Sequence, residues 1–312
     1  MAKKTDKIES RSKNGLEVGH QVRLASSFAV IVALGLIAIK SYAWFTTGSV
    51  ALLGSLLDSV LDFSISFINF FVVRHALTPA DNEHRFGHGK AEALAALAQG
   101  IIIAVSAIFL LTKSSDRFFN PQPIAQGGIG IIVIVIAIIA TFTLVSFQRK
   151  VAKNTGSLAI AADSAHYEGD LYMNLTVIIS LVLTVYADLP MADPILGGVV
   201  AIILFASARG ILVKAGKQLM DHEASEETRH AIRTIILAHP DVLSLHDLRT
   251  RRSGTQIFIQ AHIELDGKMS LFRAHRISDE VEAAIMKVYP GADVILHQDP
   301  EGHEELTELE QS

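Results

Sequence analysis

The chain contains six long apolar stretches separated by short polar segments. Each is close to the ~20 residues that a helix needs to cross a bilayer. We predict six transmembrane helices, at 23–45, 52–75, 91–113, 126–148, 157–186 and 192–213. The segment 1–22 is charged and has neither an apolar core nor a cleavage signal, so the first stretch is predicted to be a retained helix rather than a signal peptide.

After about residue 214 the pattern changes to that of a small soluble domain. Alternating and helical periodicities predict a helix, two strands joined at a Ser-Gly turn, a second helix and a third strand. We place these elements at 225–238, 242–252, 255–265, 271–289 and 292–300. The order α-β-β-α-β predicts an open α+β sandwich over 214–300. The acidic tail, 301–312, is predicted to be disordered.

Basic residues gather in every second polar segment. The N-terminal segment carries Lys3, Lys4, Lys7, Arg11, Lys13 and Arg23, and the segments after the second and fourth stretches carry Arg74, Arg85, Lys90, Arg149, Lys150 and Lys153. The segment between the third and fourth stretches has only Lys113 and Arg117. Because positive segments stay in the cytoplasm, both termini are predicted to be cytoplasmic. The predicted fold is an all-α six-helix membrane bundle with a C-terminal cytoplasmic α+β domain.

The composition is typical of a membrane protein that handles metal. Half of the 312 residues are hydrophobic and the mean hydropathy is +0.38, which is more apolar than a soluble protein of this length. The absence of cysteine excludes disulfides and thiolate zinc sites and leaves His, Asp and Glu as ligands. Thirteen histidines favour an imidazole–carboxylate metal protein, although some are expected to be ordinary surface residues.

Two pairs of ionisable residues lie inside the second and fifth apolar stretches. Asp58 and Asp62 are spaced i, i+4, as are His166 and Asp170, so each pair shares one face of its helix. A charge buried in the membrane costs about 2.5–3.5 kcal/mol, which is a reason to expect function. Three carboxylates and one imidazole make a tetrahedral site for a divalent ion such as zinc. The alternative is a structural polar seam or a pairing with Lys40.

Asp163 precedes Asp170 by seven residues and lies on the same predicted face. It either guides ions towards the site or caps the start of the buried stretch, and both interpretations stay open. Glu168 points elsewhere by helix geometry, so we do not predict it to be a ligand.

Two further clusters lie outside the apolar stretches. Asp81, His84 and His88 fall within eight residues beside two glycines, in a loop that can wrap a metal or be simply solvated. In the soluble domain the candidate ligands are His246, His262, His275, His297 and Asp299. Alternate residues of a strand share a face, so the last two can bind together, and the set could hold two ions bridged by the carboxylate. Spacing alone equally allows scattered surface histidines.

Six segments of the chain resemble the cation diffusion facilitator family, in particular its bacterial zinc and ferrous-iron efflux type. In the family's order they are SLLDSVLD, PADNEHRFGHGKAEALAALAQ, ADSAHYEGD, LHDLRTR, FIQAHIEL and VILHQDP, and the resemblance covers about residues 20–300. It implies a homodimer of six-helix protomers in the inner membrane, each with a cytoplasmic metallochaperone-like domain, that exchanges Zn²⁺ for protons.

The resemblance also implies roles for individual residues. The transport site would consist of Asp58, Asp62, His166 and Asp170. A loop site would consist of Asp81, His84 and His88, and a cytoplasmic two-metal site of His246, His262, His275, His297 and Asp299. An interlocking salt bridge near the membrane face of the dimer would join Lys90 and Asp221. Glu83 and Arg85 depart from the nearest relatives and alter the charge of the loop site.

The predicted function is therefore export of a divalent cation, Zn²⁺ first, in exchange for protons, because metal binding to these ligands must release protons. The same ligands tolerate Fe²⁺ and Cd²⁺. A passive divalent metal channel is the alternative, although tight binding at a single site slows conduction. A metalloenzyme is disfavoured because the chain has no HExxH-type motif. No nucleic acid partner is expected.

Overall fold

The structure of the protein is a computed structural model that describes residues 2–48, 50–120, 128–187, 189 and 191–302. Its contacts divide the chain into two units. The helical unit is Val18–Leu219, and the second unit consists of Met220–Ser312 together with Met1–Glu17. The predicted disorder of the acidic tail 301–312 lies, from residue 303 onward, outside the described residues.

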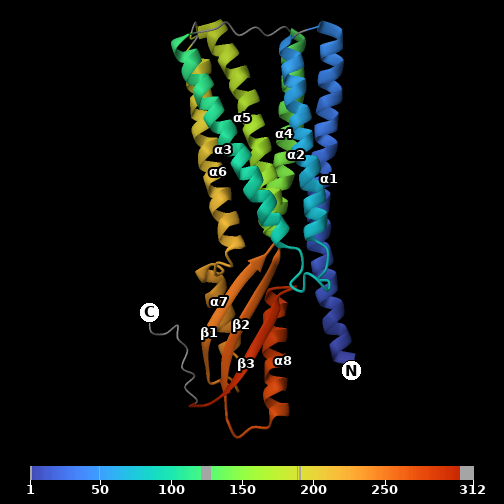
Figure 1. Ribbon diagram of the computed structural model, residues 1–312, viewed down its shortest axis with the longest axis vertical. Coiled ribbons are helices and arrows are strands. Elements are labelled where there is room, and N and C mark those ends of the chain that lie inside the picture. The colour runs from blue at the N-terminus through green and yellow to red at the C-terminus, as the bar shows by residue number, and fades with distance from the viewer. Residues whose placement is uncertain (1, 49, 121–127, 188, 190, 303–312) are drawn as a thin grey trace. The chain divides into compact units, whose positions relative to one another are not determined.

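Each of the six predicted transmembrane stretches forms a helix (Figure 1). The bounds are α1 Ala2–Thr47, α2 Val50–Ala76, α3 Lys90–Phe119, α4 Gly128–Thr155, α5 Leu158–Ala187 and α6 Ala192–Leu219. α1 begins at Ala2, well before its apolar stretch. The charged segment continues the helix because it is rich in Lys, Arg and Glu, which are good helix formers, and contains no proline.

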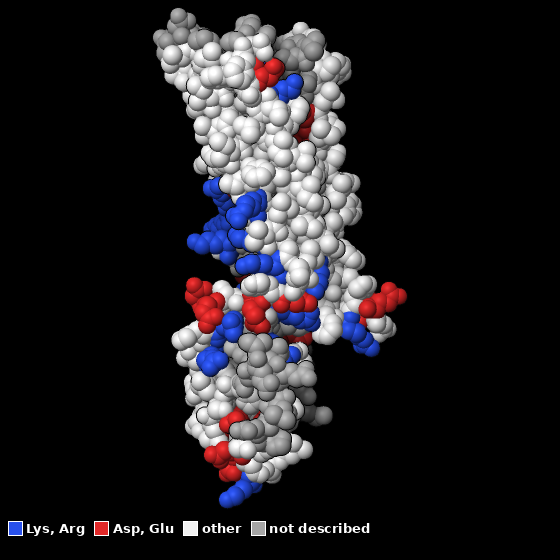
Figure 2. Space-filling model, turned by 60° about the vertical axis from the view of Figure 1, so that its left-hand side comes forward, with Lys and Arg blue, Asp and Glu red and all other residues white. Residues whose placement is uncertain are grey.

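Five helical segments within the described residues are long and apolar enough to cross a membrane: Glu17–Thr47, Ser55–Ala76, Lys90–Phe119, Ile129–Thr155 and Ala192–Leu219. α5 is not among them, and it carries Asp163, Glu168 and Asp170. Figure 2 shows a broad belt of the helical unit with almost no Lys, Arg, Asp or Glu, and basic side chains gathered at one end of this unit. That distribution is typical of a membrane-spanning bundle.

α3 and α6 run side by side along the helical unit (Figure 1). A Cβ atom built on Gly197 of α6 would lie 2.6 Å from Ser114 Oγ of α3, closer than side chains tolerate. Glycine at this position therefore allows the two helices to approach closely, as small residues do in membrane proteins. The buried side chains that join α3 and α6 to α5 are Ile103, Ala107, Ala165, Val200, Leu204 and Ala208.

The small domain of the second unit follows the predicted order of elements. Its bounds are α7 Glu226–Leu237, β1 Ser244–Ser253, β2 Gln256–Leu265, α8 Leu271–Val288 and β3 Asp293–Pro300. The sheet order is β1-β2-β3, with β1 antiparallel and β3 parallel to β2. Ser225 caps α7 by accepting a hydrogen bond from the Thr228 N–H. The predicted fold class, a helical membrane domain followed by a small α+β domain, is confirmed.

The core of this domain lies between the sheet and the two helices. Isoleucines that are fully buried fill it from both helices and from the central strand: Ile232, Ile236, Ile259, Ile263 and Ile285. From Ile259 to Leu265 of β2 the buried residues alternate with less buried residues that face the other side of the sheet. That other side carries the histidines of β1, β2 and β3.

Candidate metal sites

The two pairs of ionisable residues predicted inside the membrane lie on α2 and α5, which bring three of the four side chains together. Asp62, His166 and Asp170 each offer a donor atom, and these atoms lie within 4.8 Å of one another. His166 Nε2 lies 3.2 Å from Asp62 Oδ1, and both side chains are largely buried. Asp170 Oδ2 is buried and has no hydrogen-bond partner among the described residues. A buried oxygen left without a donor is costly unless a cation or water meets it, so this group fits a divalent ion.

Asp58 lies outside that group of three, one helical turn before Asp62. It lines a cavity of about 490 Å³ together with His166 and Asp170. The cavity extends between α3, α5 and α6 to Lys113 and Asp193, which lie near the C-terminal end of α3 and the N-terminal end of α6. Three members of the predicted quartet, Asp58, His166 and Asp170, thus line one cavity, and Asp62 joins His166 and Asp170 in the group of close donor atoms.

The ion pair of Asp62 is with His166 rather than with Lys40. Lys40 Nζ instead donates to Ser55 O at 3.1 Å and to Ser59 Oγ at 2.6 Å. Both acceptors lie on α2, so the ammonium is satisfied by neutral groups. The alternative in which these acids exist to neutralise Lys40 is therefore less well supported than a site for a cation.

Asp163 is fully buried and lies at the centre of a polar network. Its carboxylate accepts hydrogen bonds from Ser66 Oγ (3.3 Å), Gln99 Nε2 (3.2 Å) and Gln148 Nε2 (2.5 Å). Ser66 Oγ also lies 2.8 Å from the Tyr167 hydroxyl. The donors come from α2, α3 and α4, so one carboxylate on α5 links four helices. This geometry favours a structural tie over either sequence-based interpretation of Asp163.

Glu92 is a second buried carboxylate, and sequence reasoning missed it. It is 1% exposed at the start of α3, and its Oε1 accepts a hydrogen bond from Ser157 Oγ at 3.0 Å. Ser157 directly precedes α5, where a negative charge stabilises the helix dipole. Glu92 therefore positions the start of the helix that carries His166 and Asp170. Glu92 lies between alanines in the sequence, and nothing in its spacing predicts a contact with Ser157, which is 65 residues away.

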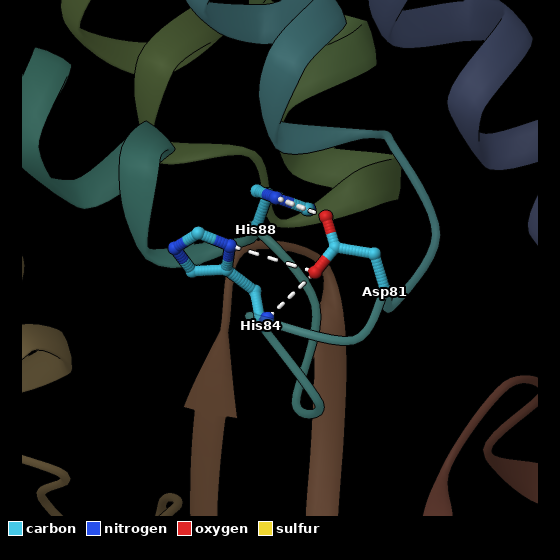
Figure 3. Close-up of side chains that lie close together, drawn as sticks. All are labelled: Asp81, His84 and His88. Atoms are coloured by element: carbon cyan, nitrogen blue, oxygen red, sulfur yellow. Dashed lines mark hydrogen bonds and ion pairs between the residues drawn. The ribbon is translucent and has the colours of Figure 1, made fainter.

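The loop between α2 and α3 brings Asp81, His84 and His88 together (Figure 3), with donor atoms within 4.8 Å of one another. Asp81 Oδ1 lies 3.6 Å from His84 Nδ1, and Asp81 Oδ2 lies 3.4 Å from His88 Nε2. Gly87 has a φ of 77°, a conformation that suits glycine and turns the chain between the two histidines.

The Asp81 carboxylate is held by the backbone of its own loop. Oδ1 accepts from the N–H of His84 at 2.6 Å and from the N–H of Glu83 at 2.9 Å. These bonds, first the one from His84, lower the pKa of Asp81 below its ordinary value. The carboxylate is therefore fixed and ionised beside the two imidazoles, as a metal ligand must be.

In the small domain, three histidines stand in register across the three strands. His246 of β1 pairs with His262 of β2, which pairs with His297 of β3. The buried Asp299 lies beside them, two residues after His297. Its Oδ2 lies 3.3 Å from His246 Nε2 and 3.0 Å from His262 Nδ1, while its Oδ1 lies 3.3 Å from His297 Nε2. The two oxygens thus face different imidazoles, which is the geometry of a carboxylate that can bridge two ions.

His275 lies apart from the other predicted ligands of the small domain. It is exposed on α8 and lies 3.9 Å from Asp279, one helical turn away. Sequence reasoning missed Asp247, whose Oδ2 lies 3.9 Å from His262 Nε2. Neighbours on a regular strand face opposite sides, so Asp247 was not expected near this face. A register shift between His246 and Arg249 changes that alternation locally.

The two members of the predicted interlocking salt bridge lie in different units. Lys90 begins α3, and its Nζ donates to Leu219 O at 3.4 Å. Asp221 has a φ of 52° and lies 3.4 Å from Arg251 Nη1. The bridge between Lys90 and Asp221 stays a prediction.

Comparison with known protein families identifies both parts of the chain. Residues 26–220 match the profile described as the cation efflux transmembrane domain, and residues 224–301 match that of the cation efflux protein cytoplasmic domain. The chain belongs to the cation efflux, or cation diffusion facilitator, family. The family resemblance inferred from the motifs is confirmed. The protein is a multi-pass membrane transporter of metal cations.

Relatives match the chain over nearly its whole length. The cation-efflux pump FieF of Klebsiella pneumoniae subsp. pneumoniae is 43% identical over 282 residues, which cover 90% of this chain and 94% of the relative. FieF of Pectobacterium atrosepticum is 44% identical over 279 residues, which cover 89% and 93%. A solved structure of the metal-bound C-terminal domain of the CzcD transporter from Thermotoga maritima is 34% identical and covers 25% of this chain and 93% of that one, with a TM-score of 0.25.

Proposed function

We propose that this cation efflux protein exports Zn²⁺ from the cytoplasm in exchange for protons. The observation that carries the proposal is the group formed by Asp62, His166 and Asp170 inside the helical unit. Its unpartnered Asp170 oxygen is a place for a cation, and charged side chains inside a membrane helix are costly unless they have such a partner. Zn²⁺ is the transported substrate here, not a resident cofactor.

The donor set suits zinc. Three close donors leave one position of a tetrahedron, and Asp58, which lines a cavity with His166 and Asp170, can fill it by turning its side chain towards them. A single imidazole among carboxylates also accepts Cd²⁺ and Fe²⁺, so we propose these as secondary substrates.

Exchange for protons follows from the chemistry of these ligands. Carboxylates and imidazole bind a metal only after losing their protons. A site that opens to the cytoplasm loads metal, and one that opens to a more acidic outer side trades the metal for protons. The imidazole is the ligand type that titrates nearest neutrality. The proton gradient then drives export through rocking of helices around a site near mid-membrane.

The position of the cavity supports a direction for release of the metal ion. It leads from His166 to Lys113 and Asp193, at the ends of α3 and α6 that lie away from the basic segments. Because basic segments stay in the cytoplasm, we propose cytoplasmic termini, an inner-membrane location and release at the Asp193 end. Arg117 Nη1 lies 2.7 Å from Asp193 Oδ2 and joins α3 to α6 there.

We further propose that the protein works as a homodimer and that the small domain senses Zn²⁺. The family of residues 224–301 is named ZT_dimer, which supports dimerisation. The two carboxylate oxygens of Asp299 face different imidazoles, which supports binding of two ions. His275 lies apart from them and would reach an ion only in the assembled dimer or after a local shift. Metal there would neutralise acidic groups and favour the contact between two copies. The loop site is proposed to be a further regulatory position.

Zn²⁺ flux into proteoliposomes, measured with and without an imposed pH gradient, tests this function. Antiport predicts that the gradient accelerates flux and that Asp62→Ala abolishes it. Flux that ignores the gradient would indicate a passive channel instead. His230→Ala, which removes an exposed imidazole of α7 outside the proposed sites, is the matched control. Running the assay with Zn²⁺, Cd²⁺ and Fe²⁺ ranks the substrates.

A further inference from the structure

A fourth potential metal ligand, His75, lies beside the loop site. His75 is exposed in the last turn of α2, and its ring centroid lies 4.7 Å from that of His88. The His88 ring lies in turn 4.5 Å from that of His84. Three imidazoles are therefore in contact in a row, next to the carboxylate of Asp81.

Thr78 sets the orientation of the middle imidazole. Its hydroxyl donates to His75 O at 2.6 Å, and the same oxygen lies 2.9 Å from His88 Nδ1. A hydroxyl has one proton, so with that proton given to the carbonyl it must accept from His88 Nδ1–H. Nε2 of His88 is then the unprotonated ring nitrogen, which can bind a metal, and it lies 3.4 Å from Asp81 Oδ2. A ring fixed in this way by a hydrogen bond to its other nitrogen is typical of a metal ligand.

The three loop residues alone leave a zinc ion one ligand short. Zinc held by protein side chains for structural purposes is almost always four-coordinate. His75 is not in the group whose donor atoms lie within 4.8 Å of one another. Its side chain is exposed and its ring already lies against the His88 ring, so His75 is the nearest further imidazole that a change of side-chain torsions could turn towards the ion.

We propose that His75 is the fourth protein ligand of the loop site, which then binds Zn²⁺ through three imidazoles and one carboxylate. This rests on the proposed role of Asp81, His84 and His88 as ligands. A closed set of four ligands holds its metal and leaves no open position for exchange. The loop site is therefore a structural metal site that links the last turn of α2 to the residues that precede α3, and transported ions do not pass through it.

A histidine in the last turn of a helix has another use, because a positive charge there stabilises the helix dipole. That role needs no metal, so the test must detect coordination itself. The chain has no cysteine, which provides such a test. A thiolate bound to Co²⁺ gives a near-ultraviolet charge-transfer band that imidazole and carboxylate ligands do not give.

The experiment uses the full-length protein in detergent, carrying His75→Cys and titrated with Co²⁺. The thiolate–cobalt band is expected to appear and to disappear when Asp81→Ala is added. His230→Cys, the same change at an exposed position of α7, is the control and is expected to give no band. Absence of the band in His75→Cys, or its persistence without Asp81, overturns the proposal.

Zn²⁺ titration separates this inference from the proposed loop site. His75→Ala is expected to weaken the loop's Zn²⁺ affinity by at least about tenfold, since even groups behind the ligands contribute that much. If Asp81→Ala removes a bound Zn²⁺ while His75→Ala changes nothing, the loop site stands and the fourth ligand is wrong. If neither variant changes Zn²⁺ binding, the loop site itself is wrong.

Discussion

His166 Nε2 lies 3.2 Å from Asp62 Oδ1, and this contact joins α5 to α2 inside the helical unit. Neither helix carries a complete ligand set, so the site forms only while the two helices keep this alignment. A sliding of α5 against α2 by even part of a turn would separate the donors. Metal affinity and helix position are thus linked by geometry, which is what a transporter that alternates access requires.

Asp163 is expected to contribute stability rather than to conduct ions. Asp163→Ala removes the acceptor of three hydrogen bonds, which come from Ser66, Gln99 and Gln148. At about 0.6 kcal/mol for each hydrogen bond within a membrane, the loss is roughly 2 kcal/mol of unfolding free energy. Unfolding in mixed detergent, compared with that of Asp116→Ala at the exposed end of α3, measures it. Unchanged stability together with slower Zn²⁺ flux would instead favour an ion-guiding role.

Asp81 predicts a pH dependence in the loop. Its pKa is lowered in the folded protein, so its hydrogen bonds from the loop amides are present above the ordinary carboxyl pKa and are lost as pH falls through the lowered value. In metal-free protein, Asp81→Ala should therefore speed amide exchange of His84 near neutral pH, and the difference should shrink at acid pH. Exchange rates followed by mass spectrometry across that range check this. An equal difference at all pH values would contradict it.

Asp299 is expected to matter for metal sensing and not for the transport step. Asp299→Ala removes the carboxylate that faces His246, His262 and His297, so Zn²⁺ bound by the full chain should fall. Combined with His262→Ala, it should lower the sensitivity of flux to zinc and leave residual proton-coupled flux. Asp266→Ala, an exposed carboxylate after β2, is the control. A double variant as inactive as Asp62→Ala would refute a regulatory role.

Much of the fold follows from pattern. Apolar stretches near the length of a bilayer predicted six helices, and the alternation in 255–265 predicted β2 because one face of that strand packs on the core. The start of α1 was not predictable in this way, because a charged segment without proline reads as loop or helix alike. Element order in the small domain was predicted; its register shift at His246 was not, since a bulge leaves no periodic signal.

The site residues likewise divide into those that spacing along the chain predicts and those that only tertiary packing brings together. The i, i+4 spacing placed His166 and Asp170 on one face of α5 and Asp58 and Asp62 on one face of α2, and the ligand chemistry of these four residues joined the two pairs in one predicted site. Partners of Asp163 were missed because Gln99 and Gln148 are single polar residues whose contacts are set by tertiary packing. His75 was missed for a similar reason. It belongs by sequence to the end of a membrane helix, and only the reversal of the chain at Gly87 brings His88 back against it.

The most direct test of the account is the movement of protons that accompanies Zn²⁺ through the site of Asp62. In proteoliposomes with a pH-sensitive dye inside, each addition of Zn²⁺ should move protons in the opposite direction, and the imposed pH gradient should set the Zn²⁺ rate. Asp62→Ala should abolish both signals while the protein still inserts and His230→Ala keeps both. Zn²⁺ flux that proceeds at the same rate under every imposed gradient, with no proton counterflow, would contradict antiport.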